Sequence, residues 1–129
     1  MGIFDSIFGK KEPTEPQDKK IPWIFLESLE QLETMEADSK ERPQVIFKHS
    51  STCGISSMVL KIFNGSYDPT LDYDPYFLTI QAHRDLSNVI ADRFGVRHES
   101  PQLLILKNGK VIFHTSHGAI ADLELSKYL

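Results

Sequence analysis

The chain has one cysteine, Cys53, and its type and setting offer the clearest chemistry in the sequence. It lies between a strand-like run ending near Lys48 and apolar residues with helical spacing, which places it on or beside the first residue of a helix. Unpaired amides and the positive dipole end at that position favour the thiolate, the form that attacks disulfides. A lone cysteine is often a small buried hydrophobe. Here the polar or small neighbours from Ser50 to Gly54 favour the reactive interpretation.

A serine stands where a second sulfur would make the site a dithiol. Cys53 and Ser56 form a C-x-x-S motif, and one helical turn puts their side chains on the same face. Serine cannot form a disulfide, so an oxidised intermediate must be resolved by a second molecule. The hydroxyls of Thr52 and Ser56 are expected to support the thiolate by hydrogen bonds. Two histidines, His49 and His98, are the candidates for proton transfer.

Other kinds of site find little support. The spacings His49-x-x-x-Cys53 and His114-x-x-His117 suit metal ligation, but no carboxylates are grouped with these histidines, so we expect no metal. The chain has no G-x-S-x-G, G-x-G-x-x-G or P-loop motif. Neither a serine hydrolase nor a bound nucleotide cofactor is therefore expected.

Strands and helices alternate from Ile21 onward. Apolar runs predict strands near residues 23–26, 44–48, 76–80, 102–106 and 111–114. Helices are expected over about 28–39, 55–63 and 85–94, with a last one after Ser116. The alternation implies parallel pairing, and Asn108-Gly109 between two apolar runs predicts an antiparallel hairpin. The sequence thus predicts an α/β, thioredoxin-like fold: a mixed central sheet of about five strands flanked by about four helices, with a C-terminal β-hairpin and helix.

A proline at the entry to the fourth expected strand is the second candidate element of the site. Bonds before proline are the only peptide bonds that readily become cis. In thioredoxin-like folds a cis-proline at this place faces the catalytic cysteine and leaves backbone groups free to pair with a substrate strand. We therefore expect a cis Ser100–Pro101 bond. Ser100, Pro101 and Gly54 would then line the substrate groove beside Cys53.

The first twenty residues differ from the rest of the chain. An apolar face of Ile3, Phe4, Ile7 and Phe8 is followed by a charged, proline-containing stretch up to residue 20. Residues 1–20 are predicted to be an amphipathic tip and flexible linker, and residues 21–129 to be the thioredoxin-like domain. So short an apolar face binds a membrane or a partner only weakly.

Composition excludes several classes of protein. With 14 basic and 18 acidic residues, the chain carries a net charge of −4, which argues against nucleic-acid binding. No apolar run approaches the roughly 20 residues of a membrane span. A single cysteine allows no internal disulfide. Together with the lack of a signal peptide, it indicates a reducing, cytoplasmic setting.

Three separated motifs resemble one known family. They are Phe47-Lys-His-Ser-Ser-Thr-Cys-Gly-Ile-Ser56, His83-Arg-Asp-Leu-Ser-Asn88 and Arg97-His-Glu-Ser-Pro-Gln102. With the Asn108-Gly109 hairpin and Ser116-His117, they make residues 21–129 similar to the YtxJ family, the monothiol bacilliredoxins of the bacillithiol system. Members often carry proline directly after the cysteine, where this chain has Gly54.

The resemblance implies a cytosolic bacterial oxidoreductase with no bound cofactor. Cys53 would remove a low-molecular-weight thiol, bacillithiol, from S-thiolated proteins through a mixed disulfide, so the thiol acts as co-substrate. Two alternatives remain open. One is a non-catalytic thioredoxin-like protein-binding module with an incidental Cys53. The other is a peripheral tether whose functional part is residues 1–20.

Overall fold

The computed structural model describes residues 20–129, whose elements follow the expected order. The strands are β1 (Ile24–Phe25), β2 (Gln44–His49), β3 (Asp74–Thr79), β4 (Gln102–Lys107) and β5 (Lys110–Ser116). The helices are α1 (Leu29–Asp38), α2 (Gly54–Gly65) and α3 (Arg84–Phe94), followed by the 3₁₀ helices η2 (His117–Asp122) and η3 (Leu125–Tyr128). The tip and linker expected over residues 1–20, and their membrane or partner contact, lie outside the described residues apart from Lys20.

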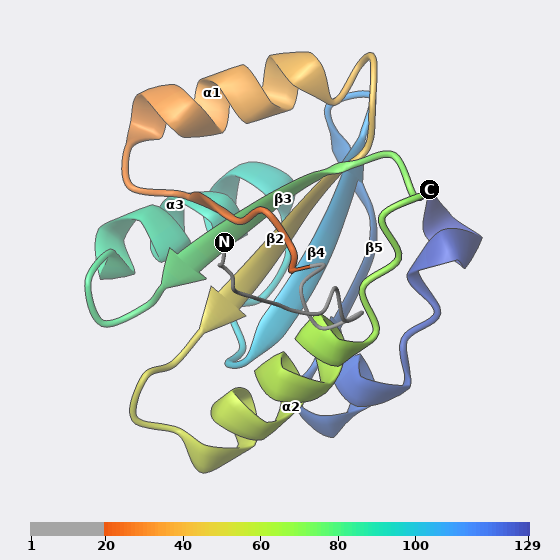
Figure 1. The fold of residues 1–129 in the computed structure, drawn as a ribbon. Coiled ribbons are helices and arrows are strands. Elements are labelled where there is room, and N and C mark those ends of the chain that lie inside the picture. The colour runs from red at the N-terminus through yellow and green to blue at the C-terminus, as the bar shows by residue number, and fades with distance from the viewer. Residues whose placement is uncertain (1–19) are drawn as a thin grey trace, which may run out of the picture.

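The strands form one mixed sheet in the order β1-β3-β2-β4-β5 (Figure 1). Strand β3 is parallel to β1 and β2, whereas β4 is antiparallel to β2 and β5. The β2–β3 pairing runs from Gln44 opposite Asp74 to His49 opposite Thr79. The carboxyl ends of β2 and β3 therefore meet at one edge of the sheet, where the chain turns toward Cys53.

Helices cover both faces of the sheet, with α1 and α3 on one side and α2 on the other (Figure 1). Successive strand residues point to opposite faces, so β2 contributes to two cores. Its fully buried Ile46 shares one core with Leu32 of α1 and Ile90 of α3. The next residue, Phe47, shares the other core with Val59 of α2. Because of the same alternation, neighbouring polar side chains at the end of β2 also point to opposite faces of the sheet.

Local signals in the sequence set several element ends. Helix α1 begins with a capping box: Ser28 Oγ accepts from the Gln31 amide at 3.2 Å, and Gln31 Oε1 accepts from the Ser28 amide at 3.1 Å. Helix α3 ends at Gly95, whose φ of 66° suits a residue without a side chain. The hairpin turn uses positive φ at Asn108 (55°) and Gly109 (77°), as its sequence predicts.

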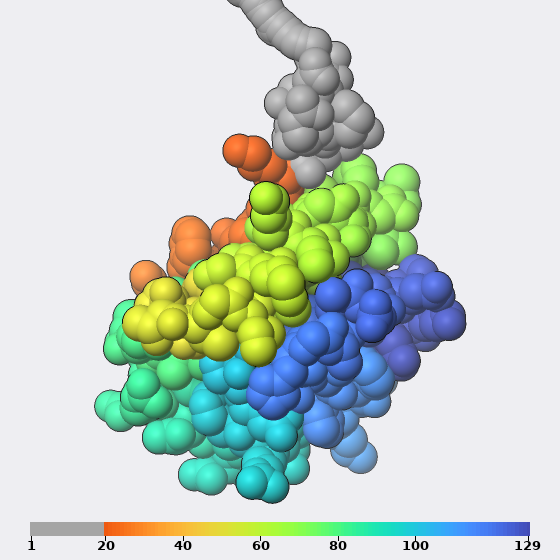
Figure 2. Space-filling view, turned by 90° about the horizontal axis from the view of Figure 1, so that it is seen from below, coloured from red at the N-terminus to blue at the C-terminus, as the bar shows by residue number. Residues whose placement is uncertain are grey.

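Helix α2 forms over the residues that the apolar spacing predicts, but the sheet covers only part of its apolar face. Five apolar residues follow the helical period, but only Val59 and Phe63 are buried. Ile55, Met58 and Ile62 are 50%, 53% and 41% exposed, because the sheet lies under the opposite side of the helix. These three residues, the α2 stripe, leave an apolar surface on the helix that begins at Cys53. Figure 2 shows α2 on the molecular surface beside the C-terminal segment.

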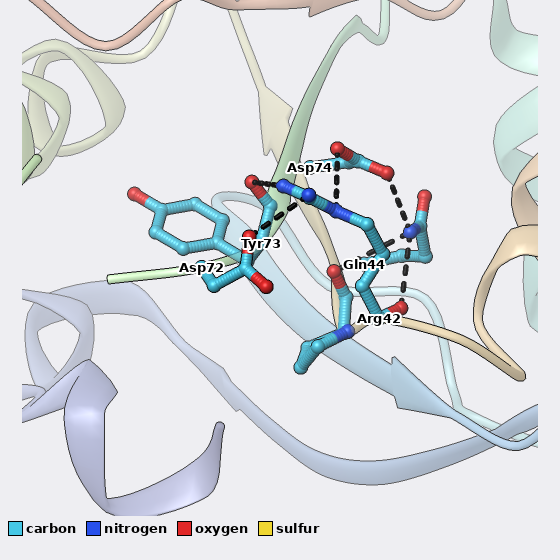
Figure 3. Close-up of polar contacts among 6 residues, drawn as sticks. Arg42, Gln44, Asp72, Tyr73 and Asp74 are labelled. Carbon is cyan, nitrogen blue, oxygen red and sulfur yellow. Dashed lines mark hydrogen bonds and ion pairs between the residues drawn. The ribbon is translucent and has the colours of Figure 1, made fainter. Parts of the chain in front are cut away.

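A polar clamp fixes the start of β2 and β3, at the sheet edge away from Cys53 (Figure 3). Arg42 forms ion pairs with Asp72 (2.8 Å) and Asp74 (3.1 Å) and donates to the Tyr73 carbonyl (3.1 Å). The fully buried Gln44 donates from Nε2 to Asp74 Oδ2 at 2.7 Å and to the Arg42 carbonyl at 3.1 Å. The clamp therefore ties the loop before β3 to the first residues of β2.

We expect Gln44→Ala to lower the free energy of unfolding by about 2 kcal/mol, because a buried hydrogen-bonding side chain is lost and Asp74 loses a donor. The control Asp72→Ala should cost less than about 0.5 kcal/mol, since that carboxylate is largely exposed. Urea denaturation measures both values. Equal losses for the two variants would contradict the assignment.

Candidate active site

Cys53 is the N-cap residue of α2, in agreement with the sequence. Its backbone is extended (φ −106°, ψ 120°), and its amide donates to the Ser50 carbonyl at 3.3 Å, which closes the turn between β2 and α2. The half-buried side chain makes no capping hydrogen bond. The first turn of α2 carries no acidic residue. The sulfur therefore lies at the positive end of a helix whose first amides have no intrahelical acceptors.

Gln81, which the sequence analysis missed, holds the turn that precedes Cys53. Its Oε1 accepts from the Ser51 amide at 3.0 Å, and its Nε2 donates to Ser50 Oγ at 2.9 Å and to Thr52 Oγ1 at 3.2 Å. Gln81 comes just after β3, the parallel neighbour of β2. That neighbouring strand end was the only sequence signal that could have indicated it. The Thr52 hydroxyl thus already accepts a hydrogen bond within the turn.

Ser56 lies inside the protein rather than at its surface. It is fully buried, its Oγ accepts from the Ser50 amide at 3.0 Å, and His49 Nδ1 lies 2.8 Å from the same oxygen. The hydroxyl thus ties the end of β2 to the first turn of α2. Burial lowers the pKa of His49 from its ordinary value, so its neutral form predominates at neutral pH.

The Ser100–Pro101 bond is cis, which confirms the prediction. In the β2–β4 register Gln102 lies opposite Lys48, so Pro101 comes at the sheet edge where β2 turns toward Cys53. The Pro101 carbonyl accepts from the His117 amide at 3.0 Å. Ser100 Oγ is buried with no hydrogen-bond partner in the described part of the chain. The cis-proline segment is thus anchored by the Pro101 carbonyl, while the buried Ser100 hydroxyl stays unpaired within the described residues.

Gly54 is exposed in the first turn of α2. A Cβ atom built on it meets no atom within 4 Å, so packing does not require a glycine here. A proline, as the family resemblance implies at this position, would also fit the first helical position, where proline is favoured.

The two histidines considered for proton transfer lie on different faces of the sheet. His49 faces α2, whereas its neighbour Lys48 points toward α3 and meets His98 there. Lys48 Nζ is 3.3 Å from His98 Nδ1 and 3.5 Å from the Ser87 carbonyl, and Ser87 Oγ is 3.1 Å from the same ring nitrogen. The structure thus brings His49 together with Ser56, and His98 together with Lys48.

The environment of Lys48 shifts two pKa values downward. Lys48 is fully buried, and burial lowers its pKa from 10.5 to about 8. The pKa of His98 is lowered by burial first, and then by the positive charges of Lys48 and Arg84, against a smaller opposing effect of Glu99. The neutral form of His98 therefore predominates at neutral pH.

A family model described as monothiol bacilliredoxin BrxC matches residues 24–125. The chain belongs to this family. The match confirms the resemblance on the three sequence motifs. All the candidate site residues of this bacilliredoxin, from His49 to Pro101, lie within the matched range.

Solved structures agree on the fold of the bacilliredoxin. One described as a candidate oxidoreductase with a thioredoxin fold is 35% identical, with a TM-score of 0.70 over 81% of this chain and 91% of that one. Thioredoxin NaTrxh from Nicotiana alata is 22% identical, with a TM-score of 0.64 over 90% and 95% of the two chains. The Malassezia sympodialis thioredoxin is 14% identical, with a TM-score of 0.66 over 84% and 89%. The last two show the fold alone, and all three confirm the predicted thioredoxin-like architecture.

Residues 20–129 show neither a cluster of metal ligands nor a membrane-spanning helix. No group of three or more His, Cys, Asp or Glu side chains in this range is placed to hold a metal ion. None of the helices in the same range is long and apolar enough to cross a membrane.

Replacing the buried ammonium of this bacilliredoxin should stabilise it. We expect Lys48→Met to raise the free energy of unfolding at pH 7 by about 1–2 kcal/mol, because the desolvation cost outweighs two lost hydrogen bonds of about 1 kcal/mol each. Between pH 8 and 10.5 the folded wild type has lost a proton that the unfolded chain keeps, so the wild type gains stability as pH rises. The advantage of Lys48→Met should therefore shrink across that window.

Urea denaturation at several pH values measures the difference between the two proteins. A variant less stable than the wild type at pH 7, or a difference that does not change with pH, would contradict the pKa assigned to Lys48.

Proposed function

We propose that this bacilliredoxin is a monothiol thiol–disulfide oxidoreductase in which Cys53 is the nucleophile. The observation that carries the proposal is the position of Cys53, half-exposed at the N-cap of α2 with a side chain free of capping bonds. Free amides at a helix start stabilise a thiolate both as attacker and as leaving group. The Ser100–Pro101 segment lies at the same end of the sheet, and in this proposal it flanks the disulfide that Cys53 attacks.

The exchange proceeds in two balanced steps. The Cys53 thiolate attacks the small-thiol sulfur of a protein–small-thiol disulfide, the old S–S bond breaks, and the protein leaves as a thiolate. The small thiol is now bound to Cys53. A second small thiolate attacks that small-thiol sulfur, which forms the symmetrical small disulfide and returns the Cys53 thiolate. Ser56 cannot take the place of this second thiol, because an alcohol forms no S–S bond.

Membership of the bacilliredoxin family makes bacillithiol the proposed small thiol and S-bacillithiolated proteins the proposed substrates. The α2 stripe supports a protein substrate, since Ile55, Met58 and Ile62 expose apolar surface on the helix that begins at Cys53. Exposed apolar patches on small domains often mark protein contacts.

We expect Cys53 in the wild type to react with iodoacetamide at pH 7 at least about tenfold faster than the same cysteine in a synthetic peptide of residues 48–58. The peptide matches the local sequence but lacks the folded helix start. Incubation with oxidised bacillithiol should give a one-to-one mixed disulfide by mass spectrometry, faster than with oxidised glutathione. Cys53→Ser should abolish it. Equal, slow labelling by both disulfides would favour the protein-binding module instead.

Ser56→Cys should turn the monothiol site into a dithiol site. The new sulfur would replace a buried hydroxyl one helical turn from Cys53, a spacing that a disulfide can bridge. After oxidised bacillithiol is added, this variant should lose the small thiol and carry an internal disulfide, seen by mass spectrometry. The control Ser66→Cys adds an exposed thiol at the far end of α2, and it should keep the mixed disulfide on Cys53. Retention of the adduct in Ser56→Cys would overturn the assigned geometry.

A further inference from the structure

Three neighbouring strands carry a row of polar side chains on one face of the sheet. Lys48 of β2 pairs with Gln102 of β4, which pairs with Ser116 of β5. Directly paired residues point to the same face, here the face covered by α1 and α3. Lys48 and Gln102 are 0% and 1% exposed, so most of this polar row is buried. Buried polar groups need partners. Each member of this row has a partner in the loop of residues 97–99, and Lys48 also lies 3.5 Å from the Ser87 carbonyl of α3.

Each member of the polar row holds a residue of the loop that leads into the cis-proline. Gln102 Nε2 donates to the Arg97 carbonyl at 2.9 Å. Lys48 Nζ donates to His98 Nδ1 at 3.3 Å, and Ser116 Oγ donates to the Glu99 carboxylate. Three consecutive loop residues are thus anchored from three strands. The buried hydroxyl of the next residue, Ser100, has no hydrogen-bond partner in the described part of the chain.

Lys48 is the unexpected member of the row. Packing alone would favour an apolar side chain, because Lys48 forms no ion pair with a carboxylate in the described part of the chain. An ammonium can only donate hydrogen bonds. Its contact with His98 therefore requires an unprotonated Nδ1, with the ring proton on Nε2. Ser87 Oγ lies 3.1 Å from the same nitrogen, so the serine hydroxyl shares this acceptor with Lys48.

We propose that Lys48 is a positioning residue that fixes the His98 ring and, through it, the Ser100–Pro101 segment that receives a protein substrate. The inference rests on the proposed function. A small disulfide needs only the sulfur of Cys53, whereas an extended peptide also needs the backbone beside the cis-proline in a fixed place. Replacement of Lys48 should therefore slow the reaction with protein substrates and leave the reaction with small disulfides unchanged.

The kinetic test compares Lys48→Met with Val45→Ala, a control that opens a buried site at the other end of β2. For Lys48→Met we expect kcat/KM toward an S-bacillithiolated peptide to fall about tenfold through a higher KM. Alkylation by iodoacetamide and exchange with oxidised bacillithiol should stay within about twofold of wild type. Val45→Ala should lose stability and keep all three rates. Equal losses toward peptide and small disulfide in Lys48→Met would overturn the proposal.

A second arm asks whether Lys48 acts through His98. Adding His98→Ala to Lys48→Met should change the peptide rate less than about twofold, because the linkage is already broken. This double variant leaves no buried ammonium without an acceptor, so it should fold even if His98→Ala alone does not. A further loss as large as the first would show independent roles and overturn the proposal.

A third experiment tests the contact between Lys48 and His98 directly, by NMR titration of the histidine ring protons. In Lys48→Met the pKa of His98 should rise relative to wild type, since one of the two positive neighbours that lower it is gone while Arg84 and Glu99 remain. An unchanged His98 titration would overturn the linkage. If the wild type exchanges with no bacillithiol disulfide, the proposed function fails and the role of Lys48 in it fails too, whereas the NMR arm still reports whether the contact exists.

Discussion

The parallel pairing of β2 with β3 is the constraint on which the site depends. Six residues of each strand are in register, and the polar clamp of Arg42 and Gln44 fixes that register at one end. At the other end the two strands stop together. Gln81, which follows β3, then lies within reach of the turn that follows β2. A slip of one residue would exchange the faces of His49 and Lys48 and separate each from its partner.

At this end of the sheet, adjacent residues of β2 point to opposite faces and hold different elements. His49 and Ser56 tie the strand end to α2, on the face where Cys53 begins the helix. Lys48 and His98 tie the same strand end to the loop before Pro101, on the opposite face. The start of α2 at Cys53 and the cis-proline segment are thus held from opposite faces of the sheet.

The sequence predicts the fold well because its signals are local and mutually consistent. The Ser28 capping box, the Asn108-Gly109 turn and the alternation of strands with helices each follow from short-range chemistry, and all agree with the observed order. The position of Cys53 could be predicted for the same reason, whereas the cis bond before Pro101 could be predicted only once the fold had been inferred. The exposure of Met58 could not, because helical periodicity does not tell how much of an apolar face the neighbouring sheet covers.

The contacts of polar side chains were also beyond prediction. Gln81 carries no motif, and its role arises only when two strand ends meet in space. From the sequence, His49 and His98 are equal candidates for proton transfer. In the folded chain they contact different residues, because strand alternation and the bend of the chain place them on different faces of the sheet. The composition gives no hint that Lys48 is buried, since lysine is usually exposed.

The open space around Gly54 has a consequence for how such a site can change over time. A Cβ atom added there meets no atom within 4 Å outside its chain neighbours and its own helix backbone, although the residue directly follows Cys53. A substitution at this position would alter what an approaching molecule meets without disturbing the core. The surface beside the sulfur can therefore change through substitutions at this position while the packing of the core stays the same.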